Sequence, residues 1–189
     1  MLRLNAAALL VLTIPSVLIA AEDTQNKTRE VKLSALRLNV PDSWKTAASA
    51  SSMRLATFQI PSETKEADEA ELAIYHFRGG GGGINDNLTR WIGQFDSDGR
   101  EVRLTRGKAR GQDYYVVEVS GTYQEPVGPP VLQQTKPAPG SRMLAMILIL
   151  EEGVYFLKMT GDDKTVAKQA DALRKAFGGS QESEEEYNL

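Results

Sequence analysis

Hydrophobic and polar residues alternate along several short segments, and this pattern predicts β-strands. Leu36, Leu38 and Val40 alternate with Arg37 and Asn39 in the segment 35–40, as expected for a strand with one buried face. Similar patterns predict strands over residues 54–60, 71–78, 101–105, 112–123, 142–150 and 154–160. The segment 142–150 is apolar on both faces, which predicts a central strand that is covered on both sides.

Two segments show the 3.6-residue period of amphipathic helices. In 84–95 the apolar stripe includes Leu88, Trp91 and Phe95, with Asn85 or Asp86 as the expected N-terminal cap. The second helix is expected after the capping-box pattern of residues 160–163, and the glycines at 178 and 179 should end it. Its buried stripe is expected to consist of Val166, Ala170, Leu173 and Phe177.

The remaining segments are rich in residues that interrupt regular structure. Residues 79–83 are five consecutive glycines, and 126–140 holds so many prolines and glycines that a long irregular loop is expected. Residues 45–52 are small and polar and predict an irregular loop or a short helical turn. Residues 22–34 are expected to be a flexible leader, and the acidic segment 179–189 a disordered tail.

The order of elements indicates the fold class. Consecutive strands, rather than strands alternating with helices, predict an α+β domain over residues 35–178 with a mostly antiparallel sheet of about six or seven strands. Two helices flanking the sheet would give an α/β/α sandwich. This element order resembles the fold shared by Mog1 and PsbP, and such a resemblance concerns the fold and not the function.

The first twenty-one residues have the layout of a secretory signal peptide. A basic start at Arg3 precedes the apolar run 6–14, and small residues follow at Ala20 and Ala21. The run is shorter than the roughly 20 apolar residues of a membrane-spanning helix. We therefore expect cleavage near Ala20 or Ala21 and export to the periplasm or the extracellular space, with a retained anchor as the alternative.

Composition narrows the chemistry. The chain has one histidine, no cysteine and a net charge of −3. It therefore lacks the basic excess typical of nucleic-acid binding, the thiols of a cysteine nucleophile and the ligands of a multi-histidine zinc site. We expect no nucleic-acid partner, no metal and no cofactor.

Several short strings between residues 36 and 178 are distinctive. The most specific is Arg90-Trp91-Ile92-Gly93-Gln94-Phe95, and others lie at 41–44, 52–56, 71–77, 79–83, 119–123, 142–144 and 160–166. In these strings the chain resembles an uncharacterised family of exported bacterial single-domain proteins. The resemblance implies an exported single domain and assigns no activity and no site residue.

The glycine run before a helix is the first candidate site. Backbone N–H groups at Gly79, Gly81 and Gly83 could bind an anion, but the Gly-Lys-Ser/Thr ending of a P-loop is absent. The alternative is a flexible connection between a strand and a helix.

Two further residues have open interpretations. His76 is expected on the same strand face as Leu72 and Ile74, either as a structural residue or as a catalytic base. Trp44 is expected either to close one end of the core or to lie exposed for a partner.

The long loop is the preferred functional candidate. Pro129, Pro130, Pro137 and Pro139 favour extended, partly stiff backbone that loses little entropy when a partner binds. The sequence therefore predicts a non-enzymatic exported domain that binds an envelope or secreted protein, or a ligand, through the loops 126–140 and 79–83. The alternatives are a small hydrolase-like enzyme that uses His76 and an envelope assembly factor.

Overall fold

The computed structural model describes residues 27–49, 51–62, 64, 68–128 and 132–189. The predicted signal peptide, Pro129 and Pro130 lie outside these residues. Among the described residues, no helix has the length and apolar composition needed to cross a membrane.

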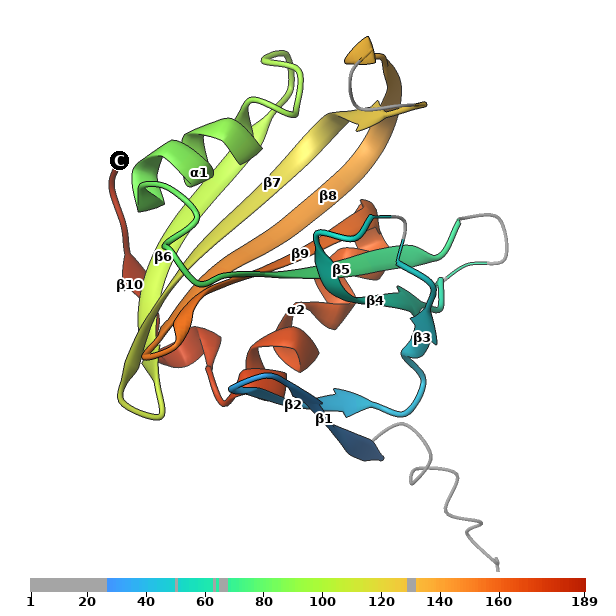
Figure 1. Ribbon diagram of the computed structural model, residues 1–189. Coiled ribbons are helices and arrows are strands. Elements are labelled where there is room, and N and C mark those ends of the chain that lie inside the picture. Colours follow the sequence, from blue (N-terminus) through green and yellow to red (C-terminus); the bar gives the residue numbers. More distant parts are fainter. Residues whose placement is uncertain (1–26, 50, 63, 65–67, 129–131) are drawn as a thin grey trace, which may run out of the picture.

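The molecule is built around one antiparallel sheet, and its class is α+β as predicted (Figure 1). The described chain places eight strands in this sheet, in the order β10-β6-β7-β8-β9-β5-β4-β3. The strands are β3 (Lys45–Ala47), β4 (Arg54–Ile60), β5 (Ala70–Phe77), β6 (Glu101–Ala109), β7 (Gln112–Pro126), β8 (Thr135–Leu150), β9 (Gly153–Asp162) and β10 (Glu185–Glu186).

Strand β8 lies near the middle of the sheet and is covered on both faces. It pairs with β7 on one side and β9 on the other. Leu144 and Met146 point into one hydrophobic core, whereas Met143, Ala145 and Ile147 point into a second core on the opposite face. The prediction of a central strand at 142–150 is confirmed.

One face of the sheet is covered by helix α2 (Asp163–Phe177) and by the hairpin of β1 (Thr28–Leu33) and β2 (Leu36–Pro41). Leu173 of α2 and Leu38 of β2 are fully buried in this core. The Asp162 carboxylate accepts a hydrogen bond from the Thr165 N–H and caps α2, while Gly178 ends it with a φ of 91°. The cap is therefore Asp162 and not Thr160, which belongs to β9.

The other face is covered by helix α1 (Ile84–Ile92), which packs on β7 through Leu88 and Trp91 (Figure 1). Gly83 precedes the helix without a side-chain cap, so the predicted capping by Asn85 or Asp86 is wrong. A helix of this length measures about 14 Å, whereas eight strands span about 34 Å. Helix α1 therefore covers only part of its face.

The structure corrects the predictions for both ends of the domain. The expected leader at 22–34 includes β1, because Val31 and Leu33 pack on the core while the strand pairs with β2. The expected disordered tail at 179–189 forms a 3₁₀ turn at Gln181–Ser183 and strand β10, which pairs with β6. The irregular segment expected at 45–52 contains β3, which pairs with β4.

The prediction of a long irregular loop at 126–140 is also wrong. Strand β7 runs to Pro126 and β8 begins at Thr135, with Pro137 opposite Gln124. Between residues 135 and 140, β8 pairs with β7 but not with β9, so this part of β8 is an edge of the sheet. Proline lacks a backbone N–H, and sheet edges and bulges tolerate this loss. The connection between the strands is therefore restricted to residues 127–134.

A buried ion-pair network fixes the tail against α2. The Arg174 side chain, 1% exposed, donates to Glu118 at 2.6 Å and to Glu184 at 2.7 Å. The Glu184 carboxylate is fully buried and also accepts hydrogen bonds from Thr105 and Tyr114. This network joins β6, β7, α2 and the C-terminal segment.

We predict that Arg174→Met lowers the free energy of unfolding by about 3–5 kcal/mol, because it leaves the fully buried Glu184 carboxylate without its counter-charge. Glu118 keeps longer ion pairs with Arg103 and Arg142, each at 3.6 Å. The control is Arg106→Met, which removes the exposed pair with Glu185 and should cost less than about 1 kcal/mol. Urea denaturation measures both. Equal losses in the two variants would contradict a structural role for the network.

Candidate functional site

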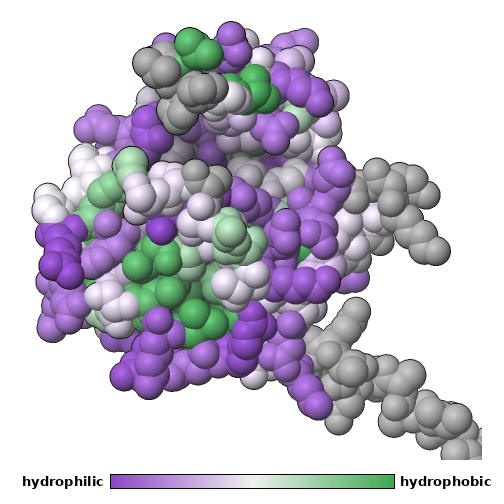
Figure 2. All heavy atoms as spheres, turned by 45° about the vertical axis from the view of Figure 1, so that its right-hand side comes forward, coloured by the Kyte–Doolittle hydropathy of each residue, from purple (hydrophilic) through white to green (hydrophobic). Residues whose placement is uncertain are grey.

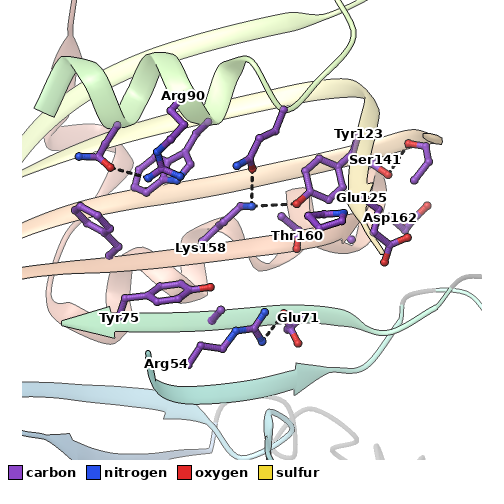
Figure 3. A pocket seen from close by; sticks show the side chains of 18 of the residues that line it. Arg54, Glu71, Tyr75, Arg90, Tyr123, Glu125, Ser141, Lys158, Thr160 and Asp162 are labelled. Carbon is purple, nitrogen blue, oxygen red and sulfur yellow. Dashed lines mark hydrogen bonds and ion pairs between the residues drawn. The ribbon is translucent and has the colours of Figure 1, made fainter. Parts of the chain in front are cut away.

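A groove of about 1000 Å³ occupies the part of the sheet that α1 leaves uncovered. Residues of β4, β5, β7, β8, β9 and α1 line it, and Figure 3 shows their side chains converging on a shared space. The exposed Val127 and Leu132 lie in the connection between β7 and β8, at the tip of this hairpin. Figure 2 shows hydrophobic atoms at this tip and a hollowed surface beneath it.

One end of the groove is lined by aromatic rings. The Phe156 ring contacts Trp91 edge-on at 5.2 Å between centroids and lies 5.1 Å from the Phe77 ring. Tyr75 and Ala73 continue this surface along β5. Such a surface can bind the apolar or aromatic part of a ligand.

Lys158 of β9 provides an amine within the groove (Figure 3). Its neighbours in the sheet register are Ala73 on β5 and Ala145 on β8. Of these two, Ala73 lines the groove, and its small side chain leaves space beside the lysine. The Nζ atom donates to Gln94 Oε1 at 2.7 Å and to Tyr123 OH at 3.0 Å. Both acceptors are neutral, and no described carboxylate forms an ion pair with the amine.

The surroundings of Lys158 disfavour its charged form. Burial, followed by the nearby positive charges of Arg90 and Arg54, lowers the pKa of Lys158 from 10.5 to about 8, and Glu71 opposes this only weakly. Burial, with the nearby Glu125, raises the pKa of Tyr123 to about 12. The phenol therefore keeps its proton at neutral pH, next to an amine that loses its own unusually easily.

Two arginines complete the positive side of the groove. Arg54 is paired with Glu71 at 2.8 Å, so its charge is largely balanced. Arg90 donates to Asn87 Oδ1 at 2.6 Å and lies 5.7 Å from the centre of the Trp91 ring. Further carboxylates line the groove at Asp68, Glu69, Glu125 and Asp162, the last being the cap of α2.

Gly81 of the glycine run lines the groove, and binding of an anion by the N–H groups of this run stays a prediction. Asn87 Nδ2 donates to the carbonyl oxygens of Gly81 and Gly83, each at 2.9 Å. Gly83 also precedes α1 as its N-cap residue. A Cβ atom on Gly81 would lie 2.7 Å from the Phe156 ring, so this close packing requires glycine.

The structure brings together two of the residues proposed from the sequence. Gly81 and Pro139 both line the groove, although they come from segments that lie far apart in the chain. Gly79 is exposed at the turn after β5, and Pro137 lies in β8; neither lines the groove.

Trp44 is fully buried, and its Nε1 donates to Gln169 of α2 at 3.1 Å. Its proposed role as an exposed partner-binding residue is therefore wrong, and it closes one end of the core.

His76 lies outside the groove, with its ring stacked on Tyr155 at 4.2 Å and Nε2 3.3 Å from the Glu152 carbonyl oxygen. No described nucleophile or carboxylate contacts its ring.

Sequence reasoning missed Lys158 as a site residue. The available signal is its position in β9, where it interrupts a run of largely apolar residues from Val154 to Met159. A lysine within a strand of this kind must either reach solvent or lie in a cavity. Within the described parts of the chain, no group of three or more residues is arranged to hold a metal ion.

Comparisons with known proteins concern the fold alone. No family model and no curated protein matches the chain, so the resemblance to an exported bacterial family stays a prediction. The crystal structure of a Pseudomonas aeruginosa protein of unknown function, described as a putative regulator, is 14% identical with a TM-score of 0.43. It covers 78% of this chain and 92% of its own.

The solution structure of cyanobacterial PsbP from Synechocystis sp. PCC 6803 is also 14% identical, with a TM-score of 0.47. The match covers 89% of this chain and 96% of the PsbP chain. PsbP is one of the two proteins whose fold the element order of this sequence resembles. The likeness says nothing about activity.

We predict that Gly81→Ala lowers the free energy of unfolding by roughly 1–3 kcal/mol, because the new methyl group overlaps the Phe156 and Phe77 rings. Gly79→Ala is the matched control in the same run, since nothing lies within 4 Å of the position that a Cβ atom would take there, and it should change stability by less than about 0.5 kcal/mol. Thermal denaturation distinguishes the two. A neutral Gly81→Ala would show that the wall is not closely packed.

We predict that Lys158→Met stabilises the protein at pH 7. Because the pKa of Lys158 is lower in the folded protein than in the unfolded chain, keeping the amine charged at pH 7 destabilises the folded state. Each pKa unit of this difference corresponds to about 1.4 kcal/mol. With a discount for solvent in the open groove, the expected gain is about 1–2 kcal/mol. Since the unfolded state binds more protons between pH 8 and 10.5, wild-type stability rises over this interval. The gain should therefore shrink toward pH 10, and urea denaturation across the pH range measures it.

Proposed function

We propose that the protein is an exported, non-enzymatic binding domain and that the groove is its binding site. The ligand combines an anionic group, such as a carboxylate, with an apolar or aromatic body. The observation that carries this proposal is the Lys158 amine, which lies in the groove and is held only by neutral acceptors.

The charge of Lys158 supports binding of an anion. An ammonium group has three N–H donors, and two of them are used by Gln94 and Tyr123. The third is available to a ligand oxygen, in surroundings where Arg90 adds a second positive charge. A hydrogen bond to a charged group contributes about 1.5–3 kcal/mol, so Lys158 would contribute a large part of the affinity.

The shape of the groove supports a small ligand with an apolar body. Its volume is that of a large small-molecule site, and Trp91, Phe156, Tyr75 and Phe77 supply aromatic surface on its walls. Gly81 and Pro139 belong to the two segments that the sequence singles out for binding, and both reach this groove. Binding of a protein partner through the hairpin tip remains an alternative.

The catalytic alternative receives less support. His76 has a backbone carbonyl as its polar neighbour and lies outside the groove. A hydrolase would need a nucleophile or an activated water next to this base. A role in envelope assembly stays a prediction.

We predict that 8-anilinonaphthalene-1-sulfonate, an anionic aromatic fluorophore, binds the folded protein at pH 7 with a blue-shifted emission. Lys158→Met should weaken this binding about tenfold or more, because it removes a hydrogen-bonded charge. Fluorescence titration gives both dissociation constants.

Lys175→Met is the matched control. Lys175 is exposed in the last turn of α2, which packs on the opposite face of the sheet. The proposal is wrong if the two variants bind the fluorophore equally, or if wild-type protein binds none while remaining folded by circular dichroism.

A further inference from the structure

The geometry points to a covalent role for the same lysine: Lys158 forms an imine with an aldehyde or ketone carried by a ligand in the groove. This inference rests on the proposed function in that the carbonyl compound enters the same groove. It adds the chemical class of the ligand's reactive group and a reversible bond to the protein.

The first argument is the position of the nitrogen. Two substituent positions on Nζ point at Gln94 and Tyr123, and no described residue occupies the remaining one. In the neutral amine, which has two N–H donors, this remaining position holds the lone pair. Ala73, the neighbour of Lys158 on β5, lines the groove, and its small side chain leaves room for a carbonyl carbon there.

The second argument is the population of the neutral amine. Lys158 is faced by Arg90 from α1, Arg54 from β4, Glu71 from β5 and Tyr123 from β7. With a pKa of about 8, about one Lys158 amine in ten is neutral at pH 7. For a lysine with the ordinary pKa of 10.5, the neutral fraction at pH 7 is about one in three thousand. Desolvation and neighbouring cations are the factors that activate amine nucleophiles in proteins.

The third argument is the adjacent phenol. When the Nζ lone pair forms a bond to the carbonyl carbon, the C–O π bond breaks and its oxygen needs a proton. The Tyr123 hydroxyl lies 3.0 Å from Nζ and keeps its proton at neutral pH. It can supply that proton and recover one from nitrogen as the carbinolamine loses water. Amine and carbonyl thus give imine and water, with no oxidant or reductant.

The probe for this inference is 4-formylbenzoate, which combines an aldehyde, an aromatic ring and a carboxylate. The folded protein is incubated with it at pH 7 in sodium cyanoborohydride, which reduces the imine to a stable secondary amine. Peptide mass spectrometry then measures the labelling rate of each lysine. The expected result is that Lys158 is labelled at least tenfold faster than Lys108, whose side chain is 71% exposed.

Two tyrosine variants test the role of the phenol. Tyr123→Phe should slow labelling of Lys158 about tenfold or more, as expected for loss of a positioned proton donor. Tyr115→Phe removes a phenol of the same strand β7 that lies outside the groove and should leave the rate within about twofold.

The inference is overturned if Lys158 is labelled no faster than Lys108 in protein that binds the anilinonaphthalene sulfonate normally. In that case the groove remains an anion-binding site and only the covalent step fails. If sulfonate binding fails while Lys158 is labelled selectively, the proposed function fails and the reactive amine remains. The two hypotheses are therefore separable in one set of samples.

Discussion

The fold depends on the burial of both faces of strand β8. Its residues alternate between two cores, so apolar surface must be covered on each side of the sheet. Helix α2 and the β1–β2 hairpin cover one side, whereas nine-residue α1 covers only part of the other. Where α1 stops, the sheet presents Lys158, Tyr75 and Glu71 in place of aliphatic residues, and the groove lies there.

Alternating residues of strand β9 serve two different faces of the sheet. Along β9, Leu157 and Met159 point into the core beneath α2, while Phe156 and Lys158 point to the opposite side. Phe156 is covered by Trp91, and Lys158, two residues further on, lines the open part of the groove. The same strand is therefore a core element on one face and a site element on the other.

Local sequence signals predicted the regular elements well. The period of Leu88 and Trp91 located α1, and the two-sided apolar run at 142–150 identified the central strand, because both signals arise from burial along a single segment. The same reasoning failed at Pro137, which lies in a strand. A high proline content shows that backbone N–H donors are missing. It does not show whether the strand would need those donors for pairing with its neighbour.

The groove could be predicted only in part, because it depends on contacts between distant segments. Gly81 and Pro139 were identified from unusual composition, but nothing local shows that they share a cavity with Lys158. The order of the tail was unpredictable for the same reason. Glu184 lies in an acidic sequence of the kind typical of disorder. Its burial depends on Arg174, ten residues earlier, and on the hydroxyl groups of Thr105 and Tyr114.

The position of Glu184 in the chain has a consequence for the order of folding. During synthesis Glu118 and Arg174 emerge first, and Glu184 follows after α2 is complete. Until then Arg174 has one of its two buried carboxylate partners, and the β6 edge lacks β10. The sheet can pair earlier, but its last edge and its buried charges are completed only when residues 180–186 dock. The chain order thus favours a final docking step late in the formation of this domain.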